Sequence, residues 1–498
     1  MSTIRPTYSG LIFLIVSIST IFTGLMFTVV LTRNLSQLDY GAWGIINSIL
    51  VYGILYNNIT TFWITREIAR GTNSAITGLF SNSIFAVIGI TIYVIIAYIV
   101  SFQTDVDVGI LLLGIILIPL ISIWNTFVAI NMAWKPHVAS YGVVTFAITQ
   151  SLLVVFFFAF MELGIFEVIL STAVAKSASI LILVKYTKKK IQMPIQFQLI
   201  KKWLKLSWVS LYPNIVGLLS VTDVIIFSII IGSAEIIAFW VVSFAISNIV
   251  SNTQAFAQGA APKLLREEGK EFLKSNINYF FYFTIPLSGL IIIFSKPALY
   301  LLNPIYETAY LATVFLTFTL FFRTISNVFQ SYIIGDEKVD KFEFSSFKDY
   351  AKSSLFSLPT IQLIKLVIYL SVLTIGIFFL VAYSLKPIEL IIFWSITALS
   401  VEIPVVIYLH TKIKKKFELQ IISNSLLKYL TSTIIISLGI FFVINEYLEY
   451  DSSFFIFFPR ILIFAVLFVG AYFGITYFID SQTRLLVKAI INEIKNRN

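Results

Sequence analysis

Long apolar runs recur through the whole chain, each about twenty residues long and each ended by a short polar segment. A helical run of this length spans the hydrocarbon core of a bilayer, which is about 30 Å thick. Lipid admits only helices or closed barrels, and these runs lack the alternation of barrel strands. Charged residues make up 12% of the chain, about half of their share in a soluble domain. The sequence therefore predicts an all-α integral membrane protein.

The runs and the polar segments between them predict fourteen transmembrane helices. We expect the spans at residues 9–31, 43–64, 76–100, 109–131, 138–161, 165–184, 207–231, 236–258, 277–302, 308–334, 358–383, 389–410, 425–445 and 458–479. Lysine and arginine are concentrated in every second connection, and the predicted outer loops contain only Arg33 and Lys386. Because basic loops stay in the cytoplasm, we predict a multi-pass protein of the cell (plasma) membrane with both termini cytoplasmic.

Two predicted hairpins resemble each other, which indicates an internal duplication. When Trp43 is placed over Trp240, Gly41 lies over Ala238, and the inner loop "ITREIARG" lies over "APKLLREE". Chance similarity between apolar helices is the alternative, but the hairpin and the loop agree at one offset. Six spans separate the two copies, and an even number makes the repeat parallel. In transporters, such a repeat places the binding site between the halves, near the middle of the membrane.

The duplication predicts two lobes and a terminal helix pair. The expected N-terminal lobe is residues 1–184 (spans one to six), and the C-terminal lobe is residues 207–410 (spans seven to twelve). Residues 185–206 start with "KYTKKK", and the segment "FQLIKKWLKLSW" starts within them and continues to residue 208. These segments predict a basic amphipathic cytoplasmic linker that lies against anionic headgroups. A solvated basic linker is the alternative for its first half. Spans thirteen and fourteen, at 425–479, lie outside the repeat and precede a cytoplasmic tail at 480–498.

Several of these segments resemble a known family. "LTRNLSQLDYGAWGIINSIL" at the first hairpin and "VTDVIIFSIIIGSAEIIAFWVVSFAISNIV" at Val221–Val250 are similar to segments of the polysaccharide (Wzx-type) flippases. These flippases are part of the multidrug/oligosaccharidyl-lipid/polysaccharide (MOP) exporter superfamily. "APKLL" after span eight and "GDEKV" after span ten also fit, and the resemblance covers the whole chain in topology. One departure is Val224, where family members commonly carry a basic residue after the preceding Asp.

The resemblance implies a transporter that moves a lipid-linked oligosaccharide or polysaccharide precursor from the inner to the outer leaflet by alternating access of the two lobes. The expected partners are a polyprenyl (pyro)phosphate-linked glycan, membrane lipids and glycosyltransferases of the same pathway, and no nucleic acid. We expect no cofactor beyond a Na⁺ or H⁺ as coupling ion. The chain has no Gly-rich phosphate loop, so we do not expect it to hydrolyse ATP. A membrane glycosyltransferase or ligase would need a sizeable outer loop with catalytic carboxylates, so we predict that the protein is not an enzyme. A cation-coupled multidrug (MATE-like) exporter of the same fold is the alternative.

Polar residues at helical spacing within the spans are the candidates for a substrate cavity. A sugar phosphate needs such faces because its polar groups cannot cross the hydrocarbon core unless protein groups or enclosed water replace their hydrogen bonds to bulk water. The candidates are Asn47 and Asn58 in span two, Lys176 in span six, Asn248, Asn252 and Gln258 in span eight, and Arg323 in span ten. The alternative is that these residues hydrogen-bond neighbouring helices.

Charged residues within spans are costly and usually functional. The guanidinium of Arg323 suits a lipid phosphate or a sugar carboxylate, and the alternative is an ion pair with Asp223 or Glu402. These two acids are the candidates for cation coupling. Lys176 is expected to meet an anionic head group or to pair with an acid. Lys365 is expected to extend toward the membrane interface.

Overall fold

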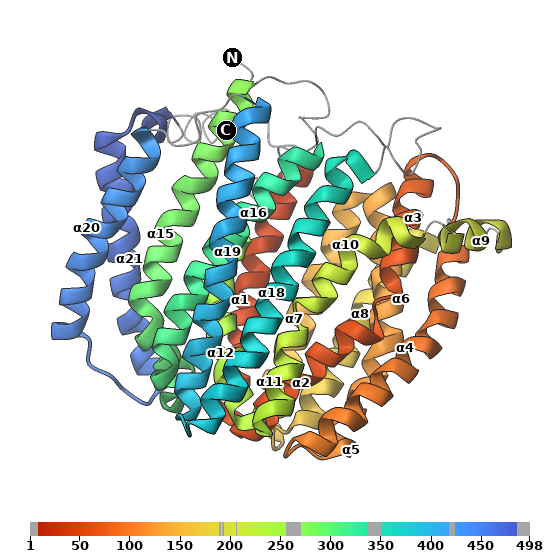
Figure 1. The fold of residues 1–498 in the computed structure, drawn as a ribbon, viewed down its shortest axis with the longest axis horizontal. Coiled ribbons are helices and arrows are strands. Elements are labelled where there is room, and N and C mark those ends of the chain that lie inside the picture. The colour runs from red at the N-terminus through yellow and green to blue at the C-terminus, as the bar shows by residue number, and fades with distance from the viewer. Residues whose placement is uncertain are drawn as a thin grey trace. The chain divides into compact units, whose positions relative to one another are not determined.

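The structure is a computed structural model that describes residues 8–188, 191, 194–205, 207–254, 270–335, 351–417 and 424–485. Within these ranges the regular structure is helical and contains no strand, which confirms the predicted all-α class (Figure 1). Twelve described helices are long and apolar enough to cross a membrane, and a bent pair, α2 (Gln37–Gly53) with α3 (Asn57–Ala69), brings the number to 13. The helix α1 (Tyr8–Asn34) covers the first predicted span. The total of fourteen stays a prediction.

The chain divides into two compact units by its internal contacts. Unit 1 comprises residues Met1–Val241 and Leu366–Pro387, and unit 2 comprises Val242–Lys365 and Ile388–Asn498. The unit boundaries fall within α12 (Ala234–Ser247) and α18 (Ser354–Ala382), and after the first residue of α19 (Pro387–Phe417). The predicted lobes follow a repeat in the sequence, whereas these units are defined by contacts between residues. The predicted lobe boundaries therefore stay a prediction.

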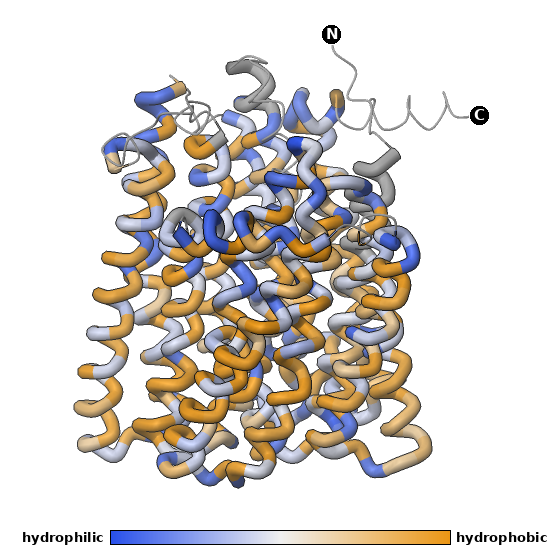
Figure 2. The backbone as a smooth tube through the Cα atoms, turned by 90° about the vertical axis from the view of Figure 1, so that its right-hand side faces the viewer, coloured by the Kyte–Doolittle hydropathy of each residue, from blue (hydrophilic) through white to orange (hydrophobic). Residues whose placement is uncertain are grey.

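The remaining helices follow the apolar runs, and in Figure 2 hydrophobic residues dominate the middle of the long helices. In unit 1 they are α4 (Ala75–Gln103), α5 (Val108–Leu112), η1 (Leu113–Ile116), α6 (Leu117–Trp134), α7 (Pro136–Phe160), α8 (Ile165–Thr187), α9 (Phe197–Lys205), α10 (Ser207–Leu219) and α11 (Thr222–Ile231). In unit 2 they are η3 (Asn248–Thr253), α15 (Lys270–Leu302), η4 (Pro304–Ala309), α16 (Tyr310–Gly335), α19 (Pro387–Phe417), α20 (Asn424–Tyr447) and α21 (Phe454–Ile479).

The second span is broken rather than straight. α2 and α3 meet at an angle of 59° across a turn of three residues. Gly53 ends α2 beside Gly89 of α4, and a β-carbon on Gly89 would collide with the Gly53 carbonyl. Beyond the turn, Thr60 donates a hydrogen bond to the buried Asn82 side chain of α4. The prediction of one helix over residues 43–64 is therefore wrong at this point, because close backbone packing and a buried polar contact bend the chain.

The two similar hairpins contact each other inside unit 1. A β-carbon on Gly41 would collide with the Ala234 carbonyl at the start of α12. A β-carbon on Gly44, one turn later, would collide with Cγ2 of Val241, and it would lie 3.7 Å from Cβ of the same residue. A β-carbon at either position would meet its neighbour too closely, so glycine permits the close approach of α2 to α12.

The loop before α5 reinforces this contact. The backbone N–H of Asp105 donates to the Gly232 carbonyl (3.2 Å), and the Ala234 N–H donates to Asp105 Oδ1 (2.9 Å). Gly232 has a φ of 73°, a left-handed conformation that favours glycine. Asp105 therefore fixes the turn between α11 and α12.

The short helix α9 packs against α3 and α4 (Figure 1). Trp203 on its inner face is fully buried among residues of α3, α6 and α7. Lys202 donates to the buried Glu67 carboxylate of α3 (2.9 Å). Trp203 and Lys202 thus fix α9 to unit 1, while Phe197 and Leu204 are exposed together with Lys201 and Lys205.

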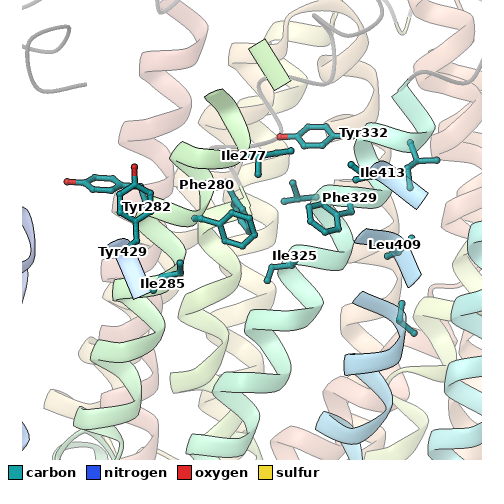
Figure 3. Close-up of a cluster of buried hydrophobic side chains, with 14 of the residues drawn as sticks. Ile277, Phe280, Tyr282, Ile285, Ile325, Phe329, Tyr332, Leu409, Ile413 and Tyr429 are labelled. Atoms are coloured by element: carbon teal, nitrogen blue, oxygen red, sulfur yellow. The ribbon is translucent and has the colours of Figure 1, made fainter. Parts of the chain in front are cut away.

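A cluster of aromatic side chains forms the core of unit 2 (Figure 3). Tyr282 of α15 packs edge-to-face on Tyr429 of α20, with ring centres 5.1 Å apart, and Phe280 and Phe329 lie in the same cluster. Tyr472 of α21 donates to the Tyr282 carbonyl (3.0 Å). This cluster therefore joins the last two long helices to α15.

Asp480, just after α21, fastens the same end of unit 2. Its carboxylate accepts hydrogen bonds from Ser425 (2.9 Å), from Tyr429 (3.0 Å) and from both the backbone and side chain of Thr483. Burial raises the pKa of Asp480, but these hydrogen bonds outweigh burial and hold the pKa below its usual value. The carboxylate therefore stays charged in the folded protein.

We expect Asp480→Ala to lower the free energy of unfolding by about 2 kcal/mol, because the buried Tyr429 hydroxyl loses its charged acceptor. Thermal unfolding in detergent micelles measures this loss. Glu446→Ala, at an exposed position of α20, is the control. Equal melting temperatures for the two variants would show that Asp480 does not hold these helices together.

Candidate functional site

Arg323 lies in the middle of α16, among mostly apolar residues of this predicted membrane span. Arg323 Nε donates to Glu402 Oε1 of α19 at 2.9 Å. The Glu402 side chain is 1% exposed, whereas that of Arg323 is 35% exposed. Glu402 is one of the two acids that the sequence offered as ion-pair partners of Arg323, and the structure brings it into contact with Arg323.

A second cation reaches the same carboxylate oxygen. Lys365 Nζ of α18 lies 2.8 Å from Glu402 Oε1, and the Lys365 side chain is only 9% exposed. The expectation that Lys365 extends toward the interface is therefore wrong. The buried carboxylate of Glu402 is a closer and stronger partner than the headgroup region, since a buried charge is costly unless it is paired.

The three side chains Arg323, Lys365 and Glu402, called the triad below, carry one positive charge in excess. Both cations contact one oxygen, and Glu402 Oε2 is buried without a hydrogen-bond partner among the described residues. A net charge at membrane depth is costly and usually serves a function. Arg323, with 35% of its side chain exposed, is the most accessible member of the triad.

Four amide side chains of unit 2 lie on α16 and at η3, and three of them are exposed. Asn327, one turn along α16 from Arg323, is exposed and donates to Gln254 Oε1 (3.5 Å). Asn248 and Asn252 on η3 are also exposed, and η3 packs against α16. Amides would lose their hydration against lipid tails. We call Arg323 and these four amides, Asn248, Asn252, Gln254 and Asn327, the unit 2 polar face. Such a set of polar side chains is suited to a hydrated ligand.

The structure changes the local geometry of the predicted span eight. Its α-helix ends at Ser247, and Asn248 and Asn252 lie on the 3₁₀ helix η3. Ser247 Oγ donates to the Thr313 carbonyl (3.0 Å), which fixes this transition against α16. Gln258, the third candidate of this span, lies outside the described residues.

Unit 1 carries polar candidates on both sides of its bend. Asn47 is the only exposed residue between Tyr40 and Leu50, a stretch that the structure describes in full. Its side-chain N–H donates to the Trp43 carbonyl (2.7 Å). Asn58 is half-buried on α3, beyond the 59° bend. The bend lies between the two asparagines. They therefore do not share one face of a continuous helix, as their spacing in the sequence predicted.

Asp223 is buried at the start of α11 in unit 1. It accepts hydrogen bonds from Tyr369 Oη of α18 (2.7 Å) and from the Val224 N–H (2.8 Å). The beginning of a helix favours a negative charge. Next to it, the Tyr52 and Thr222 hydroxyls are hydrogen-bonded (2.5 Å). The described residues contain no group of three or more His, Cys, Asp or Glu side chains that could hold a metal ion.

Lys176 of α8 is buried against aromatic rings. Its Nζ lies 3.3 Å from the ring centre of Trp124 and 3.9 Å from that of Phe146. The Trp124 indole N–H donates to Ser179 (2.8 Å), whose hydroxyl donates to the Gly142 carbonyl (2.7 Å). In the part of the chain that is described, no carboxylate pairs with Lys176. Aromatic faces attract its charge instead, an arrangement that the sequence analysis did not consider.

No protein-family model matches the chain, and no curated protein sequence matches it. Solved structures match its fold. An inward-facing multidrug resistance MATE family transporter of the MOP superfamily gives a TM-score of 0.60 at 14% identity, covering 80% of this chain and 98% of that chain. The lipid II flippase MurJ, in an inward closed conformation, gives 0.54 at 16% identity, covering 94% and 99%. The MATE transporter VcmN of Vibrio cholerae gives 0.52 at 15% identity, covering 83% and 98%.

The chain has the fold of the MOP superfamily of membrane transporters. This finding agrees with the helical architecture described above, and it extends over most of the length of each relative. Identities of 14–16% establish the fold alone. Substrate and mechanism have to be argued from the side chains of this chain.

Proposed function

We propose that this protein flips a lipid-linked oligosaccharide or polysaccharide precursor, carried on a polyprenyl (pyro)phosphate, from the inner to the outer leaflet. The observation that carries the proposal is the exposed, positively charged Arg323 on the unit 2 polar face. A phosphate or a sugar carboxylate matches its charge, and hydroxyl-rich sugars match the amides of this face. The prenyl tail remains in lipid while the polar head follows the hydrated face.

The fold supports transport, and the coverage favours a flippase. The match with the lipid II flippase MurJ covers 94% of this chain, against 80% for the inward-facing MATE transporter. The fold of such transporters suits alternating access, with the head group moving between the repeated halves. We place the protein in the plasma membrane with both termini in the cytoplasm, because basic residues are concentrated on that predicted side.

Asp223 is our candidate for coupling to Na⁺ or H⁺, and Glu402 is the second candidate. Glu402 already contacts two cations, so an added cation would have to displace one of them. Asp223 is held by a hydroxyl and a backbone N–H. If it is the coupling group, Asp223→Asn abolishes the dependence of transport on an imposed Na⁺ or H⁺ gradient. Unchanged gradient dependence in this variant would exclude Asp223.

A flipping assay tests the proposal. Purified protein in liposomes is given a fluorescent polyprenyl-pyrophosphate oligosaccharide, and chemical quenching from outside reports the fraction in the outer leaflet. We expect flipping by the wild type and a loss of about tenfold or more in Arg323→Ala, since a charge-assisted contact contributes about 1.5–3 kcal/mol. Arg460→Ala, at an exposed arginine of α21, is the matched control. Absence of flipping by the wild type would contradict the proposal.

The second candidate is a cation-coupled multidrug exporter, favoured by the TM-score of 0.60 with a MATE transporter. A cationic substrate would be repelled by the two positive charges of the triad more than it is attracted by the one carboxylate. Efflux of a cationic dye from the same liposomes distinguishes the two functions. Dye efflux that Arg323→Ala leaves unchanged would favour the exporter.

A further inference from the structure

We propose that Lys365 is a positioning residue that allows Arg323 to leave Glu402 and bind the anionic group of the substrate. This inference rests on the proposed function and deepens it, because it assigns the anion-binding step to a change of partner within the triad. Lys365 itself does not touch the substrate.

The first part of the argument is the way the triad shares one oxygen. Arg323 and Lys365 both contact Glu402 Oε1, at 2.9 and 2.8 Å, while Oε2 accepts no hydrogen bond from a described residue. Neither cation has the carboxylate to itself. One of them can leave, and the carboxylate remains paired with the other.

The second part is the difference in exposure between the two cations. The side chain of Arg323 is 35% exposed, and that of Lys365 is 9% exposed. Asn327 lies one helical turn from Arg323 on α16, and its side chain donates a hydrogen bond to Gln254 (3.5 Å). Arg323 is therefore the cation that can turn toward a hydrated ligand, and Lys365 is the cation that stays.

The third part is the cost of leaving a buried carboxylate alone. Removing the partner from a buried ion pair is strongly unfavourable, because the remaining charge is neither hydrated nor paired. Without Lys365, the departure of Arg323 would leave Glu402 in that state. Lys365 removes this penalty, so that the substrate anion competes only for Arg323.

The ligand chemistry is an anion that accepts two parallel hydrogen bonds from a guanidinium. A pyrophosphate on the lipid carrier and a carboxylate on a sugar both fit. Farnesyl pyrophosphate probes the first source, dodecyl glucuronide probes the second, and dodecyl glucoside is the neutral control.

Binding of these probes to the full-length protein in nanodiscs tests the inference. Lys365→Met leaves a neutral pair of Arg323 with Glu402, and we expect its affinity for the anionic probe to fall about tenfold or more. Adding Glu402→Gln to Lys365→Met releases Arg323 from the carboxylate and should restore affinity. Arg323→Ala should lose affinity with or without the other changes. Lys296→Met, at an exposed lysine paired with Glu307, is the matched control.

The rescue separates this role from a structural one. A variant that loses affinity only by misfolding would not regain it through a second substitution, and melting temperatures report the fold independently. The inference is overturned if Lys365→Met binds like the wild type, if the double variant does not recover, or if no anionic probe binds better than the neutral glycoside. Preference for the pyrophosphate or for the glucuronide identifies the anion source. Anion binding without flipping would keep the inference and reject the proposed function.

Discussion

Glu402→Ala is expected to lower the free energy of unfolding by about 3–5 kcal/mol, the range found when one partner of a buried ion pair is removed. In this variant Arg323 and Lys365 lose their shared carboxylate and face each other as like charges. Lys365 is only 9% exposed, so hydration cannot compensate for the loss. Thermal and denaturant unfolding in detergent micelles measure the effect.

Two variants make this stability prediction specific. Glu389→Ala, at an exposed position on the same helix, should change stability little. Combining Glu402→Ala with Lys365→Met removes one of the unpaired cations and should recover part of the loss. If Glu402→Ala melts like Glu389→Ala, the carboxylate is not the group that holds the two cations.

A disulfide between residues 44 and 241 is expected to stop transport almost completely. The double variant Gly44→Cys with Val241→Cys places the two β-carbons about 3.7 Å apart, within the range of native disulfides. Alternating access requires the repeated halves to separate on each side in turn. The contact of α2 with α12 lies at the predicted outer hairpins, so a covalent link there would prevent outward opening.

The chain contains no cysteine, so the two introduced cysteines can form a disulfide only with each other within one molecule. Oxidation should arrest transport in the double variant, reduction should restore it, and each single variant should stay active under both conditions. Full transport by a fully cross-linked sample would show that this contact does not open during the cycle.

Residue patterns predicted the helical architecture better than they predicted local geometry. Apolar runs locate helices because the bilayer requires about twenty apolar residues for each crossing. The sequence does not predict the bend of span two, because the bend depends on close packing of Gly53 against Gly89 of α4. Which helices become neighbours cannot be deduced from the apolar runs. The 3₁₀ segment at Asn248–Thr253 was missed for a similar reason, since contacts with α16 fix it.

Charges within the spans were recognised as important, but their partners were only partly predicted. The sequence offers Asp223 or Glu402 as an ion-pair partner of Arg323, and the structure brings Glu402 into contact with it. Lys365 was placed at the interface because its distance from the end of the span was visible, whereas the direction of its side chain was not. The rings beside Lys176 come from two other helices, and only packing could reveal them.

The division of α18 between the two compact units restricts how this helix can move. Lys365 and Tyr369 are four residues apart, so they lie on the same side of α18. Lys365 contacts Glu402, which belongs to unit 2, and Tyr369 contacts Asp223, which belongs to unit 1. Rotation of α18 about its own axis would break both contacts at once. Spinning of α18 therefore costs one buried hydrogen bond in each unit, and the two contacts together fix its orientation about its own axis.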